Sequence, residues 1–134
     1  MNRELLIGSR SWAARMFALG LALFWGAFFV EHLREWFLRV EHGLPPARVW
    51  FAQAAHLAVV AGLIGLWRWE HWGAVLSLVA SLVFFGGLVV MSGPRSGNSA
   101  ILLGFLAVTI VPGVISLICW HARKTPSVGV APRS

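Results

Sequence analysis

Four long apolar runs limit what this chain can fold into. They cover residues 16–30, 49–66, 73–91 and 100–120 and contain no Lys, Arg, Asp or Glu. A helix needs about 20 apolar residues to cross the hydrocarbon core of a bilayer, and extending the first run upstream past Arg15 to Trp12 brings it to that length. We therefore predict spans at about 12–31, 49–66, 73–91 and 100–120.

Helices are the predicted element because the runs do not alternate polar and apolar residues. Strands in lipid must also close into a barrel of many strands. Two short connections, 67–72 and 92–99, predict antiparallel neighbours. The expected fold is all-α, a transmembrane four-helix antiparallel bundle.

Composition excludes a soluble enzyme. Only 12% of the 134 residues are charged and 58% are hydrophobic, whereas about a quarter of a soluble domain is charged. The length fits one domain, predicted over 1–124. The remainder, 125–134, contains Pro126, Gly129 and Pro132 and is predicted to be a disordered tail.

The connection after the first span has a helical pattern of its own. Leu33, Trp36 and Val40 recur at helical spacing among charged residues. This predicts a short interfacial helical extension of the first helix, which Gly43 and the two prolines at 45 and 46 then end.

Basic residues predict the orientation. With four crossings, seven Lys and Arg residues share the side of both termini and four lie on the other side. The positive-inside rule then places both termini in the cytoplasm of a multi-pass protein of the cell membrane. Seven of the eight tryptophans fall at span ends, where indoles prefer the headgroup boundary, and only Trp25 lies inside a run.

Stripes of small residues predict where helices approach closely, because packing in lipid depends on short side chains. They recur every four residues on three spans: Ala14, Ala18, Ala22 and Gly26; Ala54, Ala58 and Gly62; Gly73, Ser77 and Ser81. In the fourth span, Pro112 and Gly113 predict a kink.

One polar cluster is a candidate for chemistry. His56 lies well inside the second span with Gln53 three residues away, and Glu31 and His32 reach the same side of the bilayer from the first span. Polar groups at this depth usually face the bundle interior. They indicate either a ligand or proton site, or a histidine bonded across helices for stability. A haem between His32 and His56 would need a wide cleft, which nothing in the sequence indicates.

Other chemistry is not indicated. No nucleophile, base and acid occur in a known arrangement, and Cys119 is the only cysteine, so no cysteine-rich metal site can form. We expect no enzyme activity, no metal, no cofactor and no nucleic-acid partner. Glu70 is expected to pair with Arg68 or to cap the third helix.

The order of short motifs resembles an uncharacterised family of small bacterial four-span integral membrane proteins, a domain of unknown function. The motifs are Phe28-Phe29-Val30, Gly43-Leu44-Pro45-Pro46, Trp67-Arg68-Trp69-Glu70 and Pro112-Gly113. The resemblance covers about residues 15–120, although the segment before Gly43 is longer here than in the family's pattern. It implies a four-helix domain of the bacterial inner membrane with no assigned activity, and it carries over no catalytic residue.

Two functional hypotheses follow. The first is an accessory, scaffold or partner-binding component that contacts the bilayer and another membrane protein or a second copy of itself. The second is a small transporter or ligand-binding bundle that uses the polar cluster around Glu31 and His56.

Overall fold

Four helices make up the fold. The computed structural model describes residues 3–38, 44–92 and 98–124, which form α1 (Arg3–Leu33), a π-helical turn η1 (Arg34–Leu38), α2 (Ala47–Arg68), α3 (Glu70–Ser92) and α4 (Asn98–Lys124). No strand occurs among these residues. The predicted all-α fold is confirmed. The predicted extension of the first helix is present as η1 up to Leu38, and its remainder, with the predicted end at Gly43, lies outside the described residues. The predicted tail, 125–134, lies outside the described residues.

All four helices are long and apolar enough to cross a bilayer, judged by length and composition. Large apolar side chains are exposed along every helix, for example Leu23 at 69% and Val90 at 82%. Exposure of this kind is disfavoured in water but not in hydrocarbon. The chain is therefore a small multi-pass membrane protein.

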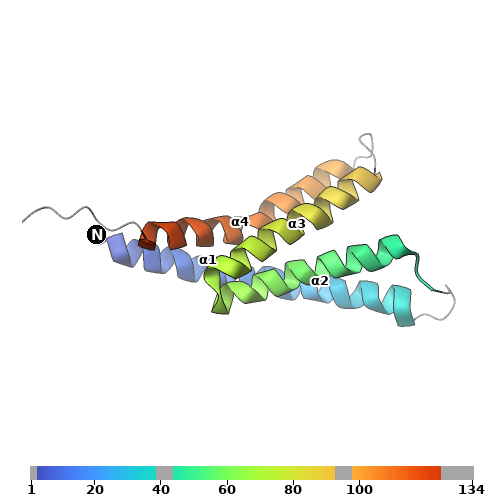
Figure 1. The fold of residues 1–134 in the computed structure, drawn as a ribbon, viewed down its shortest axis with the longest axis horizontal. Helices are drawn as coiled ribbons and strands as arrows, with labels where there is room; N and C mark the ends of the chain where they lie inside the picture. The colour runs from blue at the N-terminus through green and yellow to red at the C-terminus, as the bar shows by residue number, and fades with distance from the viewer. Residues whose placement is uncertain (1–2, 39–43, 93–97, 125–134) are drawn as a thin grey trace, which may run out of the picture.

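The helices close into a ring in which each one packs against the next and α4 packs against α1. Figure 1 shows that the start of α1, the turn between α2 and α3, and the end of α4 lie together at one end of the bundle. We call this the terminal end. At the opposite end, the α1–α2 pair and the α3–α4 pair diverge (Figure 1). We call this the cleft end.

Glycines bring α2 and α3 into close contact at the terminal end. A Cβ on Gly62 would lie 2.5 Å from the backbone nitrogen of Ser77, and a Cβ on Gly73 would lie 2.8 Å from the carbonyl oxygen of Gly65. Neither distance leaves room for a methyl group. These two glycines therefore allow the backbones to approach where larger residues would separate them.

The small-residue stripes do not all lie at helix contacts. Ala14, Ala18 and Ala22 on α1 and Gly73, Ser77 and Ser81 on α3 are buried. On α2, by contrast, Ala54 is exposed and Ala58 is only half-buried. Gly62, the third member of that stripe, is buried against α3 as predicted. Towards the start of α2, the buried face runs instead through Gln53, His56 and Val59, so polar side chains take the inward position expected for Ala54. Nothing lies within 4 Å of a Cβ built on Gly26.

Trp25 joins α1 to α4 in the middle of the bundle. Its indole Nε1 donates a hydrogen bond to Thr109 Oγ1 at 3.1 Å, and this hydroxyl donates to the carbonyl of Phe105 at 2.7 Å. Pro112 and Gly113 follow one turn later and are buried. α4 changes direction along its length (Figure 1), as expected for a proline inside a helix.

Candidate functional site

A cleft of about 230 Å³ opens at the cleft end between α1, α2 and α3. Its walls combine apolar and polar side chains from all three helices. They are His32 of α1, Trp36 of η1, Arg48, Val49, Ala52, Gln53 and His56 of α2, and Phe84, Leu88 and Met91 of α3.

Two buried polar atoms in this cleft have no hydrogen-bond partner. His56 is 3% exposed and Gln53 is 8% exposed, and neither His56 Nε2 nor Gln53 Oε1 is bonded to another protein group. The two residues lie three positions apart on one face of α2. Burying an unpaired polar group typically costs about 1–3 kcal/mol. Such groups therefore call for an explanation beyond folding.

Aromatic rings surround the His56 imidazole. Phe84 stacks on it with ring centroids 4.7 Å apart, while Phe29 and Trp25 meet it edge-on at 5.6 and 5.8 Å. The ring also has a hydrogen bond with the backbone of Trp25. These contacts from α1 and α3 fix the position of the ring, while Nε2 has no partner.

His32 meets His56 across the cleft. Their ring centroids are 6.3 Å apart and the rings are nearly perpendicular. His32 Nδ1 is 2.9 Å from the carbonyl oxygen of Phe28, one turn earlier on α1. A carbonyl oxygen only accepts, so Nδ1 is the donor in this contact and Nε2 takes no part in it.

The structure brings together three of the four residues of the predicted polar cluster. His32, Gln53 and His56 line one cleft, but Glu31 does not. Its carboxylate lies in an exposed ion pair with Arg34 at 3.6 Å, with 68% of the side chain exposed. Position 31 follows the last residue of the first apolar run, and on a helix it points away from the face that carries His32.

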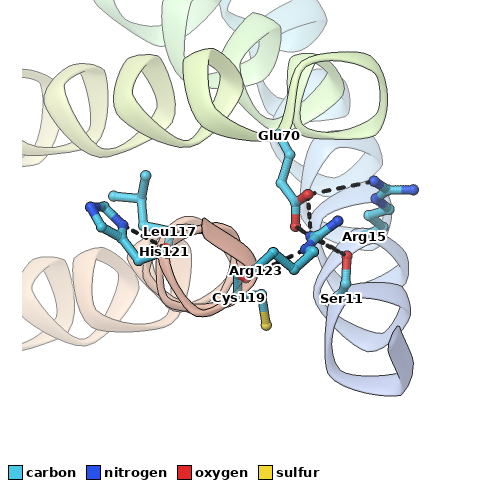
Figure 2. Close-up of polar contacts among 7 residues, drawn as sticks. All are labelled: Ser11, Arg15, Glu70, Leu117, Cys119, His121 and Arg123. Carbon is cyan, nitrogen blue, oxygen red and sulfur yellow. Dashed lines mark hydrogen bonds and ion pairs between the residues drawn. The ribbon is translucent and has the colours of Figure 1, made fainter. Parts of the chain in front are cut away.

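A second polar cluster lies at the terminal end and consists of Ser11, Arg15, Glu70 and Arg123 (Figure 2). The Glu70 carboxylate accepts hydrogen bonds from Arg123 and from Ser11 Oγ, the latter at 3.1 Å, and forms an ion pair with Arg15 at 3.8 Å. Only 10% of the Glu70 side chain is exposed. The residue opens α3, as expected, but its partners come from α1 and α4 and not from Arg68. We call these four residues the ion clamp.

The ion clamp is a structural feature, because the Glu70 carboxylate pairs with Ser11, Arg15 and Arg123, although Arg15 Nε itself has no hydrogen-bond partner. Unpartnered buried hydroxyls also occur elsewhere in the bundle, on Ser77, Ser81 and Ser116, but none of these residues lines the cleft. In the cleft, two neighbouring wall residues, Gln53 and His56, each bury an unpartnered polar atom. This pairing makes the cleft the candidate binding site.

A family model described as "Domain of unknown function (DUF7670)" matches residues 2–127. The chain belongs to this family. The resemblance to an uncharacterised four-span family is thereby confirmed. No curated protein matches the chain, and no solved structure matches it.

Seven of the ten wall residues of the cleft were not among the sequence candidates, and Arg48 and Met91 are the two of these with chemically distinctive side chains. Arg48 precedes the second apolar run and Met91 closes the third, and neither position differs from an ordinary span boundary. Both line the cleft only because α2 and α3 diverge there. The arrangement of helices, which is invisible in the sequence, was needed to find them.

The cleft is small. Pockets for drug-sized ligands usually measure about 300–1,000 Å³, and this one measures about 230 Å³. Its size fits an ion or a small molecule better than a macrocycle such as haem. Among the described residues, no group of three or more His, Cys, Asp and Glu side chains gathers as a metal site.

Proposed function

We propose that this protein is a membrane-embedded binding component without a catalytic role, and that its ligand occupies the cleft at the cleft end. The observation that supports this proposal is the pair of unpartnered buried atoms, His56 Nε2 and Gln53 Oε1. A bound ligand would supply the missing hydrogen bonds or coordination. The accessory or scaffold hypothesis accounts for the hydrogen bond of His56 with the Trp25 backbone, but it assigns no role to the two unpartnered atoms.

A stability experiment tests whether the buried Gln53 Oε1 stabilises the fold or instead serves to bind a ligand. Gln53→Met preserves side-chain length but removes the unpaired carbonyl, so the free energy of unfolding of the ligand-free protein should rise by about 1 kcal/mol. Thr109→Val is the matched control. It removes a buried hydroxyl that has partners on both sides, so stability should fall by about 1 kcal/mol. SDS titration of the detergent-solubilised protein measures both changes.

Ligand retention tests the same proposal directly. Native mass spectrometry of protein released gently from its membrane should show an adduct on the wild type that Gln53→Met and His56→Leu both lose. A loss of stability in Gln53→Met similar to that in Thr109→Val, together with no adduct, would refute the binding role and favour a scaffold.

For orientation, we propose that the terminal end faces the cytoplasm of a bacterial inner membrane. The excess of basic residues on that side supports this placement, and the resemblance noted above supports the type of membrane. A reporter that is active only in the cytoplasm should be active when fused to either terminus. Activity at one terminus alone would contradict four crossings.

A further inference from the structure

The two imidazoles of the cleft are spaced as a pair of metal ligands would be. Metal–imidazole bonds of about 2 Å place the centroids of two rings on opposite sides of one ion about 6 Å apart, and the observed separation is 6.3 Å. A direct hydrogen bond between the rings would bring them closer. The separation of the centroids is therefore compatible with one atom bridging the two rings.

His32 Nδ1 has the hydrogen bond that the non-ligating nitrogen of a metal-bound histidine usually has. A ligating histidine almost always donates its other ring N–H to a carboxylate, a backbone carbonyl or a water, which fixes the ring. His32 Nδ1 has this contact with the Phe28 carbonyl. His56 is fixed by its aromatic neighbours and by the backbone of Trp25, and its unpartnered Nε2 is more than nine-tenths buried.

The other atoms around the cleft that could coordinate a metal indicate which ion it would bind. Met91 contributes a thioether and Gln53 an unpaired amide oxygen, and no carboxylate lines the described cleft. Calcium and magnesium need several oxygen ligands. Thioether sulfur together with imidazole is typical of copper.

Charge favours the monovalent ion. Among the residues that the structure describes, no carboxylate lines the cleft, and Arg48 adds a positive charge to its wall. A dication would meet greater desolvation cost and repulsion there than Cu(I) would. We propose that the cleft binds one Cu(I) ion through His32 and His56, with Met91 and Gln53 as weaker additional ligands. This proposal rests on the proposed binding function.

Copper titration tests this proposal on the full chain in detergent micelles. Under anaerobic, reducing conditions, the wild type should remove one equivalent of Cu(I) from a chromophoric chelator. His32→Ala and His56→Gln should each weaken binding by about 100-fold or more, because loss of even a second-shell partner costs 10–100-fold. Met91→Leu should weaken it less. X-ray absorption of the loaded wild type should show two nitrogen ligands.

His121→Ala is the matched control. His121 has the same contact of Nδ1 with the carbonyl one turn earlier, at 2.9 Å from Leu117, but it lies on the last turn of α4, at the terminal end. This variant should retain wild-type copper affinity. His32 is exposed, so His32→Ala should fold normally, as circular dichroism and size-exclusion chromatography can check.

Failure of this proposal differs from failure of the binding function. The copper site is refuted if the wild type binds no copper, or if His32→Ala binds as tightly as the wild type. If Gln53→Met still raises stability and still loses an adduct in that case, the cleft binds a ligand other than copper. If both experiments fail, the cleft is not a binding site.

Discussion

Gly73→Ala should destabilise this bundle more than any other single methyl addition. The new Cβ would lie 2.8 Å from the carbonyl oxygen of Gly65 and still closer to other backbone atoms of α2. These α2 backbone atoms cannot rotate away from the added methyl group as a flexible side chain could. The α2–α3 contact must therefore open, and we expect a loss of about 3 kcal/mol, at the upper end of overpacking costs.

Gly26→Ala is the control for this prediction. It makes the same change inside a predicted span, on α1, where nothing lies within 4 Å of the added methyl group. Alanine is the better helix former by up to about 1 kcal/mol, so stability should stay level or rise slightly. SDS titrations of the two variants measure the difference. Equal effects of the two substitutions would show that close packing of α2 on α3 is not what holds this end together.

Glu70→Gln should also cause a large loss, because it removes the charge at the centre of the ion clamp. The Arg15 and Arg123 side chains would then face each other without a carboxylate. Breaking a buried ion pair costs about 3–5 kcal/mol. Here Arg15 is 29% and Arg123 46% exposed, so solvent screens part of the effect. We expect a loss of about 2 kcal/mol.

Glu31→Gln provides the comparison. It neutralises a carboxylate that also pairs with an arginine, but both side chains of that pair are about two-thirds exposed. Exposed pairs of this kind are worth at most about 1 kcal/mol and usually less. The unfolding free energy should thus change little. A Glu70→Gln variant as stable as Glu31→Gln would mean that the ion clamp forms without contributing to the fold.

The sequence was sufficient to predict the helices, because uncharged runs of spanning length leave few other folds in lipid. It also identified His32, Gln53 and His56 as candidates, since polar side chains stand out in an apolar segment. The fate of Ala54 could not be predicted. Either the small-residue stripe or the neighbouring polar residues of α2 could face the bundle interior. Only the packed structure shows that Gln53 and His56 are the buried residues there.

Long-range partners were beyond the reach of sequence patterns. Glu70 and Arg123 are 53 positions apart, and Arg68 was the nearer candidate by spacing alone. Met91 and Arg48 reach the cleft where the two helix pairs diverge. Contacts between residues far apart in the sequence depend on how the helices cross, and no local sequence pattern predicts them.

The contacts of the ion clamp can form only in a certain order while the chain is being synthesised. Arg123 is added 53 residues after Glu70, which takes roughly 3–10 s at bacterial and eukaryotic elongation rates of about 5–20 residues per second. Ser11 and Arg15 are present from the start. A nascent chain can therefore engage Glu70 from the first helix while the last one is still being made, and full closure of the ring must wait until Arg123 has been made.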